Sequence, residues 1–81
     1  MSTPANWQAT ANTLSRSWKF TDFSTAWAFA SRVALVAEKS GHHPEITVGW
    51  GEVTVVTSTH DAGNTVTEKD EHLANSINEL S

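Results

Sequence analysis

The chain has 81 residues, no cysteine and a formal net charge of −4 at neutral pH. That length predicts a single domain over residues 1–81, and the lack of cysteine excludes disulfide bonds and thiolate chemistry. Five Lys and Arg against nine Asp and Glu form no basic surface for a phosphate backbone, so we expect no nucleic acid partner. No apolar run is long enough to span a membrane, and residues 1–6 are typical of a frayed end without the features of a signal peptide. We therefore expect a cytoplasmic protein with no membrane partner.

The first half of the chain predicts a β-hairpin followed by a helix. A short strand is predicted over residues 7–11, and a second strand with alternating apolar residues over residues 13–20. Ser24 is a suitable N-cap for a helix whose apolar residues recur at helical spacing. We expect this helix to run to about Ser40, because Gly41 can supply the left-handed conformation that ends a helix.

The second half repeats that order. Residues 45–50 alternate between apolar and polar, and residues 52–60 are the clearest strand of the chain, rich in β-branched side chains. After a loop over residues 61–64, Thr67 can cap a second helix, with Asp70 three residues on in the reciprocal position of a capping box. The apolar stripe of this helix is formed by Leu73, Ala74, Ile77 and Leu80.

The predicted element order is therefore β-β-α-β-β-α. Two hairpins alternating with two helices favour an α+β fold with two layers. We expect a four-stranded antiparallel sheet that carries both helices on one face.

Three of the four histidines are candidates for proton-transfer chemistry. His42 and His43 follow the predicted first helix, and Pro44 biases His43 toward an extended conformation, so the pair should be displayed on a stiff loop. His60 closes the predicted strand and could be held rigidly near the pair. Imidazoles exchange protons near neutral pH, which makes these residues candidate general acids and bases. Glu38, four residues before His42, is a candidate partner for it.

Other interpretations of the histidines remain open on the residues alone. They could be ordinary loop residues, with Glu38 simply solvated. Three imidazoles and one carboxylate could also hold zinc, since catalytic zinc sites often have three protein ligands. Adjacent histidines point their side chains in different directions, however, and no zinc motif has this spacing, so we expect no metal.

The remaining polar and aromatic residues have structural interpretations. Asp70 is most simply a carboxylate stabilised by the N-terminal end of the second helix dipole. His72, on the same helix, is expected to be solvated. We expect the tryptophans to serve the core or an interface rather than to bind a ligand, although one near the histidines could do so; they are Trp7, Trp18, Trp27 and Trp50.

The wider pattern resembles a known family. Its skeleton is Glu38, three residues, His42-His43-Pro44, five residues, Trp50, nine residues, His60, nine residues and Asp70. Segments 32–39, 58–61 and 67–74 add to the likeness, which extends from about Trp7 to Leu80. The combined pattern is similar to that of the pterin-4a-carbinolamine dehydratases.

This resemblance implies an activity and roles for the site residues. The expected reaction dehydrates 4a-hydroxytetrahydrobiopterin, or a related 4a-hydroxytetrahydropterin, to the quinonoid dihydropterin, recycling the pterin cofactor of aromatic amino acid hydroxylases without a cofactor of its own. His42 and His60 resemble the acid/base pair of the family, and His43 a pterin-binding residue of the catalytic set. Further pterin contacts are implied at Gly41, Ser58 and Thr59, and supporting carboxylates at Glu38 and Asp70. The expected assembly is a homodimer or homotetramer.

A second function from another class stays open. Relatives in this family use the same scaffold for assembly or transcriptional partnering, so the chain could be a non-catalytic interaction protein. The histidine triad separates the two, because a pure scaffold does not need it.

Overall fold

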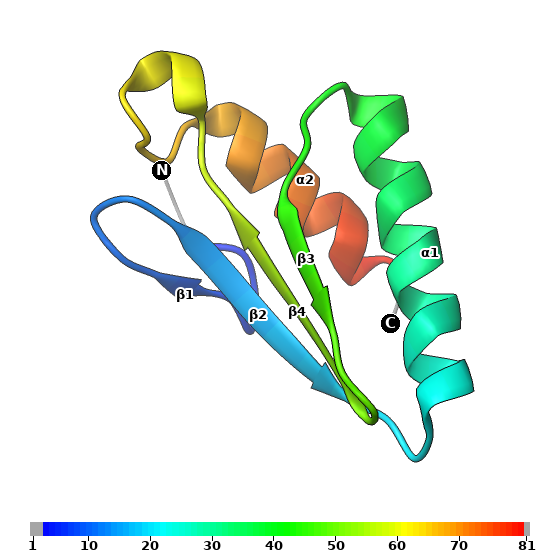
Figure 1. The fold of residues 1–81 in the computed structure, drawn as a ribbon. Helices are drawn as coiled ribbons and strands as arrows, with labels where there is room; N and C mark the ends of the chain where they lie inside the picture. The colour runs from blue at the N-terminus through cyan, green and yellow to red at the C-terminus, as the bar shows by residue number, and fades with distance from the viewer. Residues whose placement is uncertain (1–2, 81) are drawn as a thin grey trace.

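The computed structural model describes residues 3–80 and has two layers, a four-stranded antiparallel sheet and two α-helices (Figure 1). The predicted α+β class and the predicted order of strands and helices are confirmed, and one short 3-10 helix is added. The elements are β1 (Gln8–Ala9), β2 (Leu14–Lys19), α1 (Phe23–Ser40), β3 (Glu45–Val48), β4 (Glu52–Thr57), the 3-10 helix η1 (His60–Ala62) and α2 (Glu68–Asn78).

The strands follow the order β1-β2-β4-β3, with every neighbouring pair antiparallel. β2 and β4 pair along all six residues of each strand and form the centre of the sheet. β1 and β3 are therefore its edges. β1 is shorter than the strand expected over residues 7–11, because the backbone turns where the Thr10 N–H donates to the Thr13 carbonyl at 2.9 Å.

Both helices pack on one face of the sheet, as expected, and the core lies between the two layers. Trp7 and Trp18 belong to this core, with ring centroids 5.8 Å apart in an edge-to-face arrangement. Trp27 and Trp50 instead expose 57% and 73% of their surface. The other core residues are Leu14, Val53 and Val55 from the sheet, Ala26, Phe29, Ala30, Val33 and Ala37 from α1, and Leu73, Ala74 and Ile77 from α2.

The start of α1 corrects one prediction, whereas its end confirms another. Asp22, not Ser24, is the N-cap, because its Oδ1 accepts a hydrogen bond from the Thr25 N–H at 2.7 Å. At the other end, Gly41 has a φ of 70°, the left-handed conformation predicted for it. Its N–H and that of His42 donate to carbonyls of the last turn, so the helix ends sharply just before the histidine pair.

The end of β4 also differs from the prediction. The strand stops at Thr57 rather than at His60, which instead begins η1. The backbone leaves the sheet because Thr59 pairs with Thr65, its N–H donating to the Thr65 carbonyl at 2.8 Å. The turn then closes at Gly63, which adopts a φ of 78° and donates to the His60 carbonyl. His60 is thus presented by a tight turn.

The sequence predicted a frayed end over residues 1–6, but Pro4 and Ala5 are held to the domain by hydrogen bonds. Residues 1–2 lie outside the described part, but Pro4 is buried and its carbonyl accepts from the Trp7 N–H at 3.2 Å. Asn78 of α2 donates to the Ala5 carbonyl at 3.0 Å. Within residues 3–80, neither helix has the length and apolar character needed to cross a bilayer.

Candidate active site

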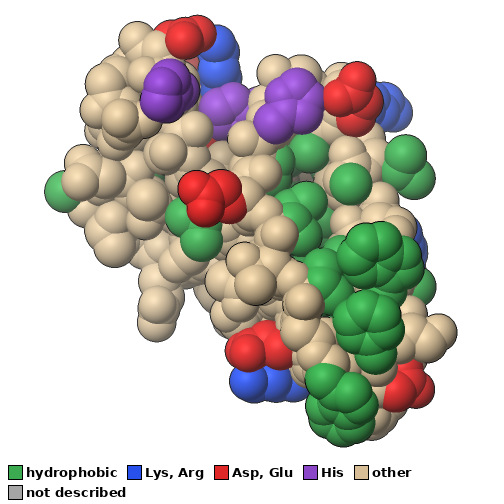
Figure 2. All heavy atoms as spheres, in the orientation of Figure 1, with side chains coloured by type: hydrophobic (Ala, Val, Ile, Leu, Met, Phe, Trp, Pro, Cys, Tyr) green, Lys and Arg blue, Asp and Glu red, His purple; other side chains and the backbone are tan. Residues whose placement is uncertain are grey.

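Three segments meet at one end of the molecule: the C-terminal end of α1, the turn after β4 and the N-terminal end of α2 (Figure 1). Histidine side chains gather on this end in Figure 2. They surround a cleft of about 240 Å³. The residues that line this histidine cleft are Gly41, His42, His43, Ser58, Thr59, His60, Asp61 and Lys69. All six residues for which the sequence predicted pterin contact are therefore brought together.

A buried carboxylate on α2 organises the site. Asp70 has no exposed surface, and four donors fill its two oxygens. Its Oδ1 accepts from His42 Nε2 and Thr57 Oγ1, both at 2.6 Å. Its Oδ2 accepts from Thr59 Oγ1 at 2.6 Å and from the Thr67 N–H at 2.9 Å, the second bond completing the capping box predicted for α2.

The same contacts set the protonation state of Asp70. Burial by itself raises the pKa of a carboxyl, because it disfavours the charged form. The hydrogen bonds from Thr57, Thr59, His42 and the Thr67 N–H outweigh that effect and hold the pKa of Asp70 below its usual value. Asp70 is therefore a fixed, buried negative charge at neutral pH.

His42 is oriented by this charge. Its side chain is only 14% exposed, and its Nε2 lies 2.6 Å from Asp70 Oδ1. A carboxylate only accepts hydrogen bonds, so Nε2 carries the hydrogen and Nδ1 keeps the lone pair in the neutral ring. Glu38, which the sequence suggested as the partner of His42, does not contact it. The pairing runs instead across the fold, from the loop after α1 to α2.

Glu38 binds the neighbouring histidine. His43 Nε2 lies 2.8 Å from Glu38 Oε1, and the two side chains are 67% and 79% exposed. Gly41 ends the helix between them, so the chain folds back and His43 returns toward the last turn of α1. The adjacent histidines thus point to different carboxylates, one buried and one in solvent.

His60 is the least constrained of the three. It is exposed on η1, and within residues 3–80 its ring makes no hydrogen bond. No group of three or more His, Cys, Asp or Glu in this described range is arranged to hold a metal ion, so the zinc interpretation gains no support there.

Comparison with known proteins identifies the family of this chain. The model of the family described as pterin 4 alpha carbinolamine dehydratase matches residues 1–80. The chain belongs to this family.

Curated relatives agree with that assignment. A protein from a Synechococcus strain is 44% identical over 75 residues, covering 93% of this chain and 80% of its own length. A protein from Natronomonas pharaonis is 42% identical over 77 residues, covering 95% of this chain and 83% of its own length. Both carry the provisional name pterin-4-alpha-carbinolamine dehydratase.

Two solved structures share the fold. One is described as a transcriptional coactivator/pterin dehydratase from Brucella melitensis, with 41% identity, a TM-score of 0.82, and coverage of 94% of this chain and 82% of that one. The other is a pterin dehydratase-like protein described as a RuBisCO assembly factor in the alpha-carboxysome. It has 21% identity, a TM-score of 0.71, and coverage of 91% and 84%, and it shows likeness of fold alone.

The structure adds three residues to this candidate site that the sequence analysis did not single out. Thr57 is buried and bonds Asp70, while Asp61 and Lys69 line the histidine cleft. Thr57 left a signal in the sequence, because it shares a face of its strand with Val53 and Val55. A buried hydroxyl on an apolar face needs a hydrogen-bond partner, so this position indicates a buried polar group nearby. Asp61 and Lys69 left no comparable signal.

Proposed function

We propose that this chain catalyses the dehydration of a 4a-hydroxytetrahydropterin to the quinonoid dihydropterin and water. Its family membership supports the proposal. The observation that carries it is the histidine cleft, in which His42 is oriented by a buried carboxylate beside His43 and His60.

The chemistry fits two imidazoles. A proton delivered to the C4a hydroxyl lets it leave as water; as the C4a–O bond breaks, the N5 lone pair forms the N5–C4a double bond. The cationic N5 then loses its proton, so one proton is given and one is taken. We assign this exchange to His42 and His60. His42 keeps Nδ1 for it, because Nε2 is bound to Asp70.

The other site residues have binding and supporting roles in this proposal. His43 contacts the pterin, and Glu38 supports His43 at 2.8 Å. Gly41, Ser58 and Thr59 contribute the backbone and side-chain surface of the cleft. Asp70 is a positioning residue, since it acts on the substrate only through His42.

A dehydration assay with purified protein tests the proposal. The 4a-carbinolamine is generated in the assay by a pterin-dependent hydroxylase, and its disappearance is followed with and without this protein. We expect a rate well above the spontaneous dehydration. An unchanged rate across a range of protein concentrations would refute catalysis. The proposal invokes no metal, so a chelator should leave the rate unchanged.

Failure of that assay would favour a non-catalytic assembly role on the same fold. One structural neighbour is described as an assembly factor, which shows that this fold also serves proteins of that class. The oriented His42 favours catalysis here, because an assembly surface does not need an imidazole bound to a fully buried carboxylate. An assembly factor would bind a protein partner and leave the dehydration rate at its spontaneous value.

We also propose that the chain forms a homo-oligomer. β1 and β3 leave two sheet edges open, and unpaired edges favour association. Large apolar side chains are exposed at Phe23, Trp27, Leu35 and Trp50, and Figure 2 shows hydrophobic side chains gathered along α1. Sedimentation should show at least a dimer at micromolar concentration, and a stable monomer would contradict this.

A further inference from the structure

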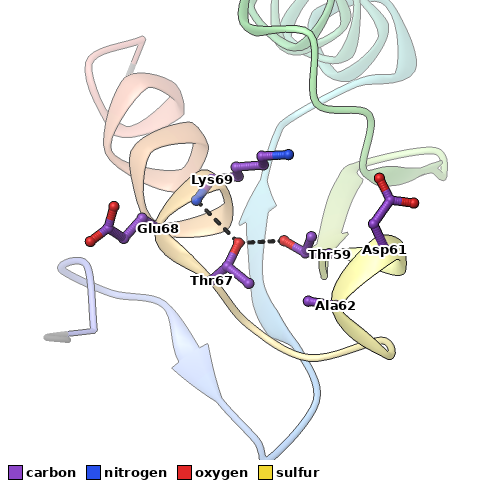
Figure 3. Close-up of a pocket in the computed structure, with 6 residues that line it drawn as sticks. All are labelled: Thr59, Asp61, Ala62, Thr67, Glu68 and Lys69. Carbon is purple, nitrogen blue, oxygen red and sulfur yellow. Dashed lines mark hydrogen bonds between the residues drawn. The ribbon is translucent and has the colours of Figure 1, made fainter.

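Two threonine hydroxyls connect the start of α2 to the turn that presents His60. Thr59 Oγ1 lies 2.5 Å from Thr67 Oγ1 and donates to Asp70 Oδ2 at 2.6 Å. The Lys69 N–H donates in turn to Thr67 Oγ1 at 3.3 Å. Figure 3 shows the bonds that join Lys69 to Thr67 and Thr67 to Thr59. We call the hydroxyls of Thr67 and Thr59 the hydroxyl chain, which ends at the carboxylate of Asp70.

The negative charge of Asp70 sets the direction in which the hydroxyl chain donates. A carboxylate only accepts hydrogen bonds, and each threonine hydroxyl has one hydrogen to give. Thr59 gives its hydrogen to Asp70, so Thr67 is the donor in the contact between the two hydroxyls. The oxygen of Thr67 then accepts from the Lys69 N–H at the start of the helix. Each bond in such a row polarises the next, so the row is stronger than separate hydroxyl contacts would be.

Thr59 is the residue through which the hydroxyl chain reaches His60. It is buried and directly precedes His60 in the sequence. Its N–H donates to the Thr65 carbonyl at 2.8 Å, and its carbonyl accepts from the Ala62 N–H at 3.2 Å. In the described part of the chain the ring of His60 makes no hydrogen bond of its own. The position of that ring therefore depends on how firmly Thr59 is held.

We propose that Thr67 is a positioning residue for both histidines of the proton exchange. The inference rests on the proposed function and adds a residue to it. The hydroxyl of Thr67 holds Thr59, the residue before His60. The N–H of Thr67 donates to Asp70 Oδ2 at 2.9 Å, and the other oxygen of Asp70 orients His42 at 2.6 Å. Thr67 is not among the described residues that line the histidine cleft, so it acts through these two neighbours.

The reaction makes such a residue useful, because one imidazole gives a proton while the other takes one. His42 lies on the loop after α1 and His60 on η1, so the two belong to different segments. Their anchors meet at the start of α2, where Thr67 contacts both. A misplacement of about 1 Å in a reacting group can lower a rate about 10²-fold. Loss of the Thr67 hydroxyl should therefore lower kcat rather than raise KM.

Thr67→Val and Thr67→Ser test this role as a pair. The valine keeps the branched shape and removes the hydroxyl, so kcat should fall by about tenfold to a hundredfold. KM should stay within about threefold, because Thr67 does not line the histidine cleft. The serine restores the donor and should retain most of the wild-type kcat. A loss of kcat in Thr67→Ser as large as that in Thr67→Val would overturn the role of the hydroxyl.

Thr67→Gly separates positioning from helix capping. Valine is a poor N-cap, so Thr67→Val also destabilises α2, whereas glycine is nearly as good an N-cap as threonine. In urea denaturation, Thr67→Gly should therefore remain close to the wild-type stability. It should nevertheless lose kcat as Thr67→Val does, because it too lacks the hydroxyl. If Thr67→Gly kept the wild-type kcat while Thr67→Val lost it, Thr67 would act as a cap only and the proposal would be overturned.

Thr65→Val is the matched control. It removes a hydroxyl of the same loop that lies 3.5 Å from the Ala11 carbonyl, outside the hydroxyl chain. Because valine keeps the branched shape and the backbone carbonyl that Thr59 uses, neither kcat nor KM should change. A loss of kcat equal to that of Thr67→Val would show that any change in this loop disturbs the site, and it would overturn the specific role of Thr67.

Amide hydrogen exchange tests the same inference without turnover. The N–H groups of Ala62 and Gly63 close the turn that presents His60. Their exchange should be faster by about threefold or more in Thr67→Val and Thr67→Gly, as expected when one supporting hydrogen bond is lost. It should be unchanged in Thr67→Ser and Thr65→Val. Equal exchange in all variants would overturn the link from Thr67 to His60, whereas an inactive wild-type protein would refute the proposed function instead.

Discussion

The molecule contains two histidine–carboxylate pairs that share one chemistry and differ in environment. His42 and Asp70 are 2.6 Å apart, with side chains 14% and 0% exposed. His43 and Glu38 are 2.8 Å apart, with side chains 67% and 79% exposed. The histidines are neighbours in the sequence, yet one is anchored to the interior and the other lies in solvent.

This difference in burial decides whether a carboxylate fixes the orientation of its histidine or only lies near it. An exposed ion pair contributes about 0–1 kcal/mol, because water and salt screen it and both side chains lose rotamer freedom. A buried carboxylate is tolerated only if its oxygens are satisfied, and Asp70 has four donors. Asp70 thus holds the ring of His42 in one orientation, whereas Glu38 can only bias that of His43.

The largest expected effect is on catalysis. His42→Ala and His60→Ala should each lower kcat/KM by about 10²–10⁴-fold, the usual size of a general acid–base contribution. The double variant should lose less than the product of the two, because residues that act as a unit are not additive. His43→Ala should mainly raise KM, with a smaller loss of kcat. Steady-state kinetics corrected for spontaneous dehydration measures all four.

His72→Ala is the matched control for these substitutions. His72 is exposed on α2 outside the histidine cleft, so its loss should leave kcat and KM unchanged. If His42→Ala and His60→Ala both kept wild-type kcat/KM, the histidines would not be the catalysts and the assembly role would be favoured.

The next effect is on stability. Asp70→Asn should lower the free energy of unfolding by about 3–5 kcal/mol, because breaking a buried pair leaves its partner groups unsatisfied. Domains of this kind have only about 5–15 kcal/mol in total. Asp61→Asn, which changes an exposed carboxylate lining the histidine cleft, should have little effect. Urea denaturation compares the two, and equal losses would show that the buried network is not what stabilises this end of the molecule.

The lowered pKa of Asp70 predicts that the stability of the protein depends on pH. The pKa of this carboxyl is lower in the folded protein than the value of about 3.9 expected when unfolded. Its contribution is therefore complete above about pH 4 and is lost as the pH falls toward the folded pKa, where the unfolded state binds more protons. Denaturation at a series of pH values should show this loss in wild-type protein. Asp70→Asn should lack this part of the pH dependence, and identical profiles would contradict it.

Local chemistry was enough to predict much of this fold from the sequence. The element order, the helix stop at Gly41 and the capping box at Thr67 each depend on residues within a few positions of one another. The two-layer arrangement followed from that order. Where two local signals competed, the prediction was wrong: Ser24 was chosen as the N-cap, but Asp22 accepts the capping bond.

The site itself required tertiary information. Helical spacing suggested Glu38 as the partner of His42, but the true partner is 28 residues away on α2. The β-branched run suggested a strand to His60, yet Thr59 turns out of the sheet to bond Asp70 and Thr65. Such contacts override local propensity and leave no periodic signal. The sequence therefore predicted six of the eight residues that line the histidine cleft, but not how the histidines pair with the carboxylates.

A smaller effect is expected from one supporting hydroxyl. Thr57→Val keeps the shape of the side chain but removes one donor from Asp70. It should lower the free energy of unfolding by about 1.5–3 kcal/mol, the usual range for hydrogen bonds to charged groups. Thr54→Val, on the opposite face of the same strand, removes only a partly exposed bond to Ser17 and should cost less. Equal losses in urea denaturation would mean that the contact of Thr57 with Asp70 is unimportant.

The smallest effect is expected at the exposed pair. Glu38→Gln should change the free energy of unfolding by less than about 1 kcal/mol. That change should disappear in 1 M salt, where the screening length falls to about 3 Å. The loss caused by Asp70→Asn should persist under the same conditions, because buried charges are screened much less. Urea denaturation at low and high salt measures both variants. If the loss of unfolding free energy caused by Glu38→Gln persisted in high salt, the exposed pair would be held as firmly as the buried one. Exposure would then not explain why His42 and His43 differ in how firmly they are oriented.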